Sequence, residues 1–291
     1  MRIVVLGDLN LDVMAHAPAE LEPGAETRDV VRAAPGGSGG TFARVAAAHG
    51  ASVAFLGCTG ADAIGDLLIR SLEEAGVESH VQRDGRRPSG VILALHRGGE
   101  RSMVCSRGAN DGIRADCIEE ATFDGADHLH LSGYALLSLA QHAAVERSVA
   151  LARDRGFSIS VDPPPASLIR GVGVDAFRSR LPESAWLFPN RTEGELLSGA
   201  SEPSAIVERL ATRAGVGALT LGGEGSLAWE EAMRHDIASE PFEDIDTTGA
   251  GDAFAGAFVA SYLARRDLAA AHRVAANAAR AHLSIDRAVP P

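Results

Sequence analysis

The sequence predicts an α/β fold: a central, mostly parallel β-sheet with helices on both faces, and a small second β-sheet that forms a lid. The main observation is that short apolar runs of strand length alternate with longer runs of helical periodicity. Two regions, 11–33 and 77–105, break this alternation with extended segments of period two. We find no internal repeat or linker, so we expect one domain over 1–291 whose lid comes from these two regions.

Six apolar runs have the length and composition of buried strands. The first run, Ile3-Val4-Val5-Leu6, begins almost at the amino terminus. His128 and His130 alternate with leucines in the third run, and this strand context favours a structural role for them over a metal pair. The predicted strands are 2–6, 52–57, 128–131, 157–161, 185–188 and 216–221.

Helical runs separate the later strands and fill the carboxyl-terminal part of the chain. An alanine-rich helix follows the glycine-rich segment at 36–43. In the lid region, Val77–Arg83 and Gly90–His96 alternate like strands, and residues 97–100 predict a hairpin turn. The further predicted helices are 139–155, 191–198, 203–214, 252–264 and 267–283.

Composition agrees with a cytoplasmic globular enzyme without identifying one, and it argues against several classes of protein. A net charge of −12 argues against nucleic-acid and acidic-membrane partners, which require basic patches. All 27 basic residues are arginine, which excludes a Walker-type phosphate loop and lysine Schiff-base chemistry. Three cysteines without metal-ligand spacing suggest reduced thiols. We see neither a signal peptide nor an apolar run of membrane length.

The segment Asp246–Phe254 carries the strongest chemical signal. Gly249, Ala250 and Gly251 stand immediately before an apolar helical run, and Asp252 falls in its first turn. A helix start presents unpaired N–H groups that attract an anion such as a phosphate. A carboxylate beside that anion can accept a proton from an attacking hydroxyl. A bare Gly-x-Gly-Asp is equally typical of a packed turn with an acidic cap, so the longer context decides between these readings.

The longer string, Asp-Thr-Thr-Gly-Ala-Gly-Asp-Ala-Phe-x-Gly-Ala-Phe from Asp246 to Phe258, resembles the carboxyl-terminal signature of the ribokinase-like (PfkB) carbohydrate kinases. Gly36-Gly37-Ser38-Gly39-Gly40-Thr41 resembles the first signature of that family. Further similar segments are Arg107–Asn110, Asp162–Ala166 and Pro189–Glu193, so the resemblance extends from Gly7 to about Ile285.

This resemblance implies an ATP-dependent kinase that phosphorylates a primary hydroxyl of a small sugar or sugar derivative. Asp252 would be the catalytic base, and the backbone of Gly249, Ala250 and Gly251 would stabilise the transferred phosphoryl group. Glu193 and Asn190 would organise Mg²⁺, through waters. The residues implied for the nucleotide are Asn190, Thr220, Gly222, Gly225, Thr248 and Asn277. Asn277 is equally typical of the exposed face of an alanine-rich helix.

Asp12 lies just after the first strand, where parallel-sheet enzymes place their ligands, so we expect it to hold substrate hydroxyls. Asn10 lies beside it, and Gly36 and Gly37 approach closely. Arg107 is a candidate for an anionic group across the cleft, although a surface arginine in a hairpin is the commoner case.

The sequence departs from the family at the sugar site and at its end. The family usually has asparagine where this chain has Thr41, and ribokinases have lysine where it has Ser38. The threonine hydroxyl can make fewer hydrogen bonds than an asparagine amide, so the resemblance does not decide which sugar is the substrate. Relatives bind a monovalent cation near 246–248, but 284–291 lack the usual Gly-Ala pair, so activation by K⁺ stays open. A homodimer formed through the lid is also compatible with the sequence.

Three alternative functions were weighed. A nucleoside kinase would use the same machinery, and the low aromatic content of 4% favours a sugar over a stacked base. Tyr134 is one ring that could line either pocket. A catalytically silent nucleotide or sugar sensor is disfavoured by the retention of Asp252. A dinucleotide-dependent dehydrogenase is disfavoured because the first strand leads to Gly7–Asp12, without the Gly-x-Gly-x-x-Gly turn.

Overall fold

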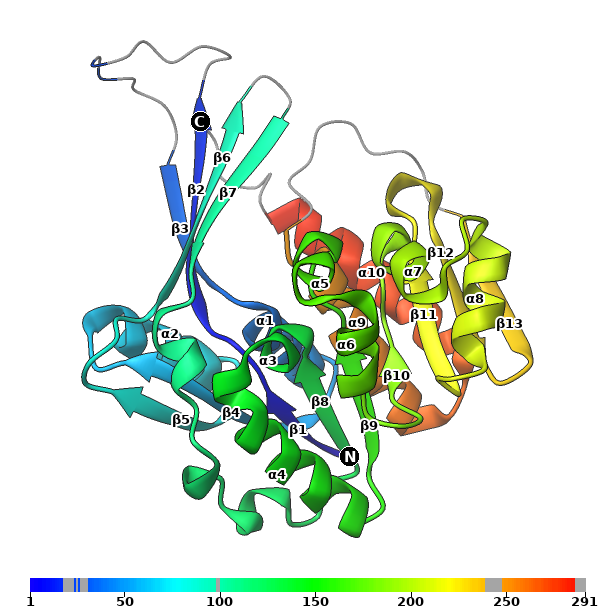
Figure 1. Ribbon diagram of the computed structural model, residues 1–291, viewed down its shortest axis with the longest axis horizontal. Helices are drawn as coiled ribbons and strands as arrows, with labels where there is room; N and C mark the ends of the chain where they lie inside the picture. The colour runs from blue at the N-terminus through cyan, green and yellow to red at the C-terminus, as the bar shows by residue number, and fades with distance from the viewer. Residues whose placement is uncertain (18–23, 25, 27–30, 98–99, 239–247, 286–291) are drawn as a thin grey trace.

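The structure is a computed structural model that describes residues 1–17, 24, 26, 31–97, 100–238 and 248–285. Its main sheet has nine strands in the order β13-β12-β11-β10-β9-β8-β1-β4-β5 (Figure 1). Pairing is parallel from β11 to β5, whereas β12 and β13 add an antiparallel edge. The predicted α/β fold is confirmed. These strands are β1 Arg2–Leu6, β4 Ser52–Gly60, β5 Glu78–Asp84, β8 His128–Ser132, β9 Ser158–Asp162, β10 Trp186–Leu187, β11 Val216–Thr220, β12 Ser226–Glu230 and β13 Met233–Ile237.

All six predicted strands are present, and the first matches its predicted bounds. Burial on both faces explains their continuous apolar runs. His128 and His130 are fully buried in β8. His128 Nδ1 lies 2.7 Å from the Ser158 hydroxyl, and both histidines contact the Ser160 hydroxyl, at 2.7 and 2.8 Å. Burial lowers the pKa of His128 to about 3, so these histidines are neutral core residues, as expected.

Helices cover both faces of the main sheet. One face packs against α1, α2, α9 and α10, through residues such as Phe42, Leu68 and Phe258. The other packs against α3 to α8, through residues such as Leu151 and Phe177. The helices are α1 Ser38–Ala48, α2 Ala63–Glu74, α3 Gly133–Leu137, α4 His142–Asp154, α5 Ala166–Val172, α6 Val174–Arg180, α7 Arg191–Ser198, α8 Pro203–Ala211, α9 Ala250–Arg265 and α10 Leu268–Ile285.

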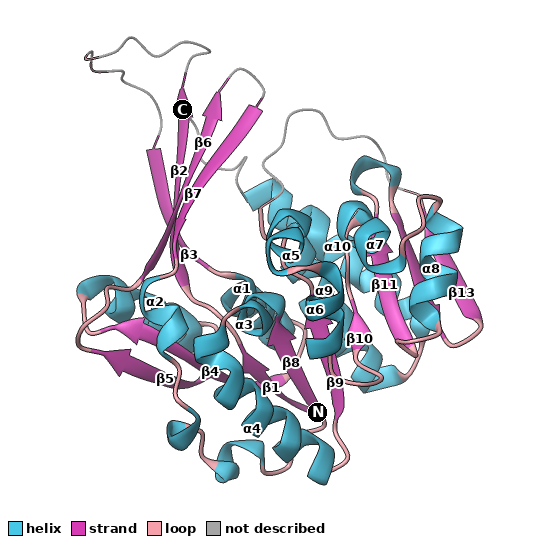
Figure 2. Cartoon of the chain, in the orientation of Figure 1, coloured by secondary structure: helices cyan, strands magenta, loops and turns pink. Residues whose placement is uncertain are grey.

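A second sheet of four strands stands away from the helix-covered main sheet, as Figure 2 shows. Its order is β3-β2-β6-β7, with a parallel β2–β6 ladder between two antiparallel pairs. The strands are β2 Asn10–Ala17, β3 Val31–Gly36, β6 Gly90–Arg97 and β7 Glu100–Ser106. The predicted hairpin pairs Arg97 with Glu100, although its residues 98–99 lie outside the described part of the chain.

The placement of Val77–Arg83 in the lid was wrong. This segment forms β5, which pairs parallel with β4 at the edge of the main sheet, from Glu78 to Asp84. An edge strand has one covered and one solvated face, so its alternating pattern does not reveal which sheet it joins. Strands β12 and β13 and helix α2 were not predicted as elements.

Among the helices that the structure describes, none combines the length and apolarity required to cross a bilayer.

Candidate active site

The proposed anion hole lies at the amino end of α9. Gly249 is its N-cap and adopts a left-handed conformation with φ 77°. A Cβ there would lie 2.7 Å from the His282 Nε2, so the position favours glycine for two reasons. The N-cap has no side-chain cap hydrogen bond, which leaves the first N–H groups of this helix available to a ligand.

Asp252 lies in the first turn of α9 and is partly buried. It is hydrogen-bonded to Ser38, at the start of α1, and to Asp162, the last residue of β9. Burial raises the pKa of Asp252 above 3.8, while these two hydrogen bonds lower it. The structure thus brings the predicted base together with two residues that sequence reasoning had not assigned to it.

Asp162 is the proton-holding member of this carboxyl pair. It is buried, and burial, followed by the charge of Asp252, raises its pKa well above 3.8. Two adjacent buried carboxyl groups cannot both be ionised at low cost, so they share one proton. The protonated Asp162 donates a hydrogen bond to the Asp252 carboxylate, and this hydrogen bond favours the ionised form of Asp252.

A buried polar network forms the floor beside these carboxyl groups. Asp8, directly after β1, accepts hydrogen bonds from Ser132 at 2.8 Å and from the Asn10 amide at 3.0 Å. Asn110 donates to the Asn10 Oδ1 at 2.8 Å and accepts from the Leu9 N–H at 2.9 Å. Asn10 is therefore held on both sides of its amide and is buried beneath the cleft.

Asp12 and the glycine loop lie against each other. Asp12 pairs with Ala34 across β2 and β3. A Cβ on Gly36 would lie 1.9 Å from the Asp12 carboxylate, and a Cβ on Gly37 would lie 2.5 Å from the backbone carbonyl oxygen of Asp8. Gly37 also has a φ of 88°. Larger residues would push the loop away from Asp12 and from the Asp8 backbone; the close approach of both glycines to a substrate stays a prediction.

Thr41 is buried in α1, where its hydroxyl accepts a hydrogen bond from Arg44 at 3.3 Å. Arg44 also donates to the Pro35 carbonyl at 3.0 Å. Burial lowers the pKa of Arg44, while the charges of Asp12 and Asp252 raise it. Arg44 was not predicted as a site residue. It places a cation within electrostatic range of both acids, one helical turn from Thr41, where the family signature differs.

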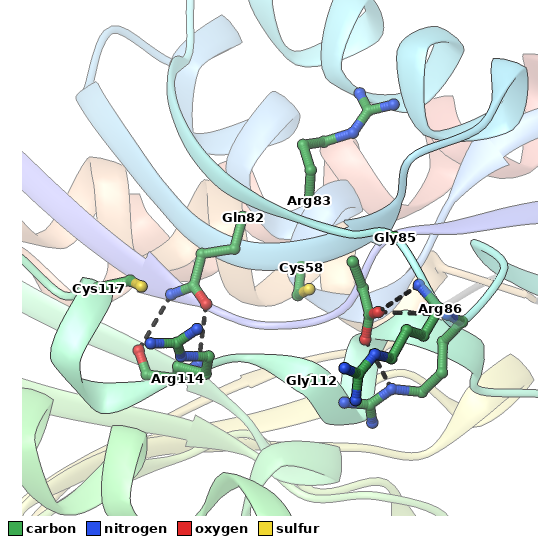
Figure 3. A pocket seen from close by; sticks show the side chains of 10 residues that line it. Cys58, Gln82, Arg83, Gly85, Arg86, Gly112, Arg114 and Cys117 are labelled. Carbon is green, nitrogen blue, oxygen red and sulfur yellow. Dashed lines mark hydrogen bonds and ion pairs between the residues drawn. The ribbon is translucent and has the colours of Figure 1, made fainter.

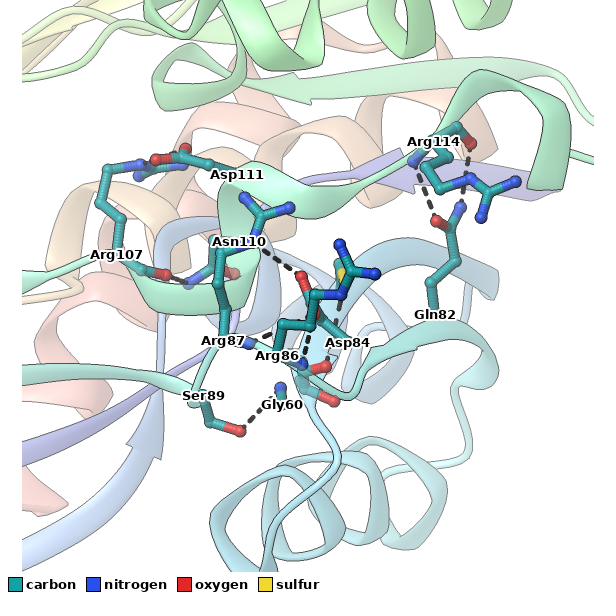
Figure 4. A network of polar contacts seen from close by, with 12 residues as sticks. Gly60, Gln82, Asp84, Arg86, Arg87, Ser89, Arg107, Asn110, Asp111 and Arg114 are labelled. Carbon is teal, nitrogen blue, oxygen red and sulfur yellow. Dashed lines mark hydrogen bonds and ion pairs between the residues drawn. The ribbon is translucent and has the colours of Figure 1, made fainter.

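Arg107 lies at the end of the lid, where its Nε is 2.8 Å from the Asp111 Oδ1 (Figure 4). Its guanidinium lies 5.4 Å from the centroid of the Tyr134 ring. Burial raises the pKa of the Tyr134 hydroxyl, and the charges of Asp8 and Asp252 add to this effect. Tyr134 thus lies electrostatically close to the acidic centre, with Arg107 across its ring.

On the other side of Asp252, Asn190 and Glu193 form a capping box at the start of α7. The Asn190 amide and N–H donate to the two Glu193 carboxyl oxygens at 2.6 and 2.9 Å, and the Glu193 N–H donates to the Asn190 Oδ1 at 3.0 Å. Burial raises the pKa of Glu193 to about 8, and the nearby charge of Asp252 also raises it. Glu193, one member of the predicted magnesium pair, is therefore within electrostatic range of the predicted base.

This pair was tested for its fit to Mg²⁺. Among the described residues, no group of three or more His, Cys, Asp or Glu is placed to hold a metal directly. Each Glu193 oxygen accepts one hydrogen bond and keeps lone pairs for water. The negative charges of Glu193 and Asp252 repel each other, and a cation bound nearby would relieve this repulsion. The residues fit a hydrated Mg²⁺ held through its waters.

The remaining predicted nucleotide residues follow β11 or lie near α9. The Thr220 N–H donates to the Pro189 carbonyl at 3.0 Å, which joins this strand end to the Asn190 loop. Gly222 and Gly225 have φ of 61° and 109°, conformations that favour glycine. Thr248 precedes α9 and is partly buried, whereas residues 246–247 of the proposed cation segment lie outside the described residues.

Asn277 is exposed on α10, which packs beside α9. Asp8, Ser132, Asp162, Asn190 and Thr220 all lie at or just beyond the carboxyl ends of parallel main-sheet strands. This edge is where open α/β sheets bind their ligands. A cluster of acids, a helix amino terminus and glycine-rich loops together provide the kinds of groups that phosphoryl transfer uses.

The comparisons with known proteins give the family. The pfkB carbohydrate kinase family matches residues 1–285, so the chain belongs to this family of carbohydrate kinases. It is 29% identical over 272 residues to the ribokinase of Haemophilus influenzae, covering 90% of this chain and 85% of that protein. It is 27% identical over 286 residues to the deoxyribokinase of Salmonella typhimurium, covering 94% and 90%. The expectation of an ATP-dependent carbohydrate kinase is confirmed at this level.

Solved structures show the same fold. The adenosine kinase from Sinorhizobium meliloti superposes with a TM-score of 0.82 at 20% identity, covering 97% of this chain and 93% of that one. A putative ribokinase II from E. coli, in complex with ATP and Mg²⁺, gives a TM-score of 0.80 at 24% identity, covering 96% and 90%. At sequence identities of 20% and 24%, these similarities show a shared fold and nothing more specific.

Proposed function

We propose that this kinase transfers the γ-phosphoryl group of ATP to a primary hydroxyl of a small sugar or sugar derivative, with Asp252 as the general base. The observation that carries the proposal is the position of Asp252 in the first turn of α9. There it lies three residues after the left-handed Gly249 and is hydrogen-bonded to Asp162 and Ser38. The amino terminus of α9 therefore carries both the proposed base and the proposed anion hole.

The reaction needs three things from these residues. Asp252 removes the proton of the attacking hydroxyl, and the shared proton on Asp162 keeps Asp252 ionised beforehand. The N–H groups of Gly249, Ala250 and Gly251 stabilise charge that develops on the phosphoryl oxygens. When bound, Mg²⁺ would neutralise charge on the ATP phosphates, and Asn190 and Glu193 would hold it through waters.

The substrate would lie over the buried network, with its hydroxyls on Asp12, Asn10 and Thr41 and against Gly36 and Gly37. Arg107 would meet an anionic or polar group on the lid side. ATP would occupy the other side, lined by Thr220, Gly222, Gly225, Thr248 and Asn277. Lid closure would exclude water and limit hydrolysis of ATP.

A nucleoside kinase is the second candidate. The adenosine kinase from Sinorhizobium meliloti shares the fold, and Tyr134 supplies one ring near the acidic centre. The aromatic content of 4% offers little further stacking surface for a base, so the sugar is favoured. A cytoplasmic location and K⁺ activation stay predictions. A homodimer formed through the lid also stays a prediction, and the exposed side chains of Leu93 and Val104 on the lid strands are compatible with it.

The test measures ADP release with Mg-ATP against pentoses, hexoses, deoxy sugar acids and nucleosides. We expect turnover on one acceptor class, and we expect Asp252→Asn to lower kcat by about 10²- to 10⁴-fold while ATP still binds. Asp236→Asn is the matched control, because Asp236 is an exposed carboxylate on the edge strand β13. Undiminished turnover of Asp252→Asn would remove it as the base. Turnover confined to nucleosides would replace the sugar by the second candidate.

A further inference from the structure

A pocket lies away from the candidate active site, beside the two chain segments that lead into and out of the β6–β7 hairpin. It has a volume of about 860 Å³, within the range of small-molecule sites. None of the predicted site residues lines it. Figure 3 shows its side chains, with the Cys58 thiol between Arg114 on one side and Arg86 on the other. The lining residues are Cys58, Gln82, Arg83, Asp84, Gly85, Arg86, Arg87, Gly112, Arg114 and Cys117.

The charge of this lining is opposite to that of the whole chain. Four arginines and one carboxylate line the pocket, whereas the protein carries a net charge of −12. Arg83 points away from the pocket in Figure 3 and pairs with Asp66 at 2.7 Å. Arg86, Arg87 and Arg114 are the remaining arginines of the lining. A local positive field in an acidic protein attracts small anions to this place.

The guanidinium groups differ in how far they are already paired. Arg87 Nε lies 2.7 Å from the Asp84 Oδ2. The other carboxylate oxygen of Asp84 accepts hydrogen bonds from the backbone N–H groups of Arg86 and Arg87. Arg114 pairs with Asp116. The Arg86 guanidinium has no hydrogen-bond or ion-pair partner among the residues that the structure describes. Its planar set of donors is therefore available for two-point binding of a phosphate group.

The two walls of the pocket are the two chain segments that connect the main sheet with the β6–β7 hairpin of the lid. Residues 85–89 lead from β5 into β6, and the 3₁₀ turn Gly108–Gly112 leads out of β7 (Figure 4). The walls touch: a Cβ on Gly112 would lie 2.9 Å from an Arg87 nitrogen and 3.0 Å from the Asp84 carboxylate. Across the pocket, the backbone of Arg114 exchanges hydrogen bonds of 2.9 and 3.0 Å with the Gln82 amide.

We propose that this pocket binds a small anion that carries a phosphate dianion, held between Arg86 and Arg87 on one wall and Arg114 on the other. Such an anion joins the two segments that lead into and out of the β6–β7 hairpin. The outgoing turn also carries Asn110, which holds Leu9 and Asn10 beneath the candidate active site. Occupation of the pocket therefore stabilises the lid connections and the floor of the site together.

Titration calorimetry of inorganic phosphate and of glycerol 3-phosphate tests the proposal on the full chain. We compare wild type with Arg86→Ser/Arg114→Ser and with the control Arg70→Ser/Arg153→Ser, which removes two exposed arginines outside the pocket. We expect wild type and control to bind one equivalent that the pocket variant loses, with Kd raised about tenfold or more. Preference between the two ligands shows whether a free phosphate or a phosphate ester is the better occupant.

Equal binding by all three proteins, or no binding by wild type, overturns the site. If the double variant fails to fold, Arg86→Ser alone decides, because no partner of the Arg86 guanidinium is lost. Hydrogen exchange of β6 and β7 provides a second readout: the anion slows exchange in wild type and leaves the pocket variant unchanged. Unaltered exchange in wild type with bound phosphate overturns the link to the lid. Neither measurement requires turnover, so the result is independent of the proposed kinase reaction.

Discussion

The hydrogen bond from Asp162 to Asp252 can be tested by removing its donor. Asp162→Ala deletes the group that stabilises the ionised Asp252, whereas Asp162→Asn keeps an N–H donor at the same place. A hydrogen bond to a charged group contributes about 1.5–3 kcal/mol, and 1.36 kcal/mol corresponds to about one pKa unit. Loss of the donor should therefore raise the pKa of Asp252 by about one to two units.

The assay is the pH profile of kcat/KM for the sugar identified by the acceptor panel. Activity requires ionised Asp252, so it falls as pH decreases through the pKa of this group, and a higher pKa moves this acid limb to higher pH. We expect the limb of Asp162→Ala to move up by about one to two pH units and that of Asp162→Asn to stay close to wild type. Thermal unfolding of both variants checks that their folds are intact. Identical profiles for the two variants, or a limb of Asp162→Ala displaced to lower pH, would refute the reasoning.

Two further predictions concern Gly249 and His272. Gly249→Ala forces a Cβ into a left-handed position 2.7 Å from the His282 Nε2, so we expect a loss of about 1–2 kcal/mol in unfolding free energy and a lower kcat. Gly171→Ala, where a Cβ meets open space inside α5, should keep or slightly raise the unfolding free energy in the same denaturant titration and leave kcat unchanged in the ADP assay, and equal behaviour of the two variants would contradict the expectation. His272 is buried, with its Nε2 2.7 Å from the Ser226 hydroxyl, and burial lowers its pKa from 6.5 to about 4. The unfolded chain then binds more protons, so this side chain should make stability fall by about 3 kcal/mol as pH decreases from 6.5 to 4, and an undiminished slope in His272→Gln would exclude it as the cause.

The sequence predicted the parts of the fold whose signal is local. The strand at 2–6 is an uninterrupted apolar run because both of its faces are buried, and the helix after Gly249 has a glycine turn at its start. The strand β5 was assigned to the wrong sheet because its alternation reports a half-covered surface and not the identity of the neighbour.

The candidate site shows the same boundary between local and tertiary information. Asp252 could be selected because its helix start and glycine turn are contiguous in sequence. The contact with Asp162 depends on the meeting of β9 with α9, and the electrostatic proximity of Arg44 to Asp12 and Asp252 depends on how α1 packs against the rest of the fold. The only available signals were an acid at the end of a buried strand before Pro163, and a charged residue in an alanine-rich helix.

The parallel ladder between β2 and β6 has a consequence for how the lid forms. Each antiparallel pair, β2–β3 and β6–β7, is local in sequence, but the ladder that unites them joins segments separated by α1, β4, α2 and β5. Closing so long a loop costs entropy before any hydrogen bond of the ladder forms, so the united lid should appear late in folding, after the main sheet has brought its two halves together. During local unfolding, the β2–β6 ladder should break first, so that the lid separates into the β2–β3 pair and the β6–β7 pair.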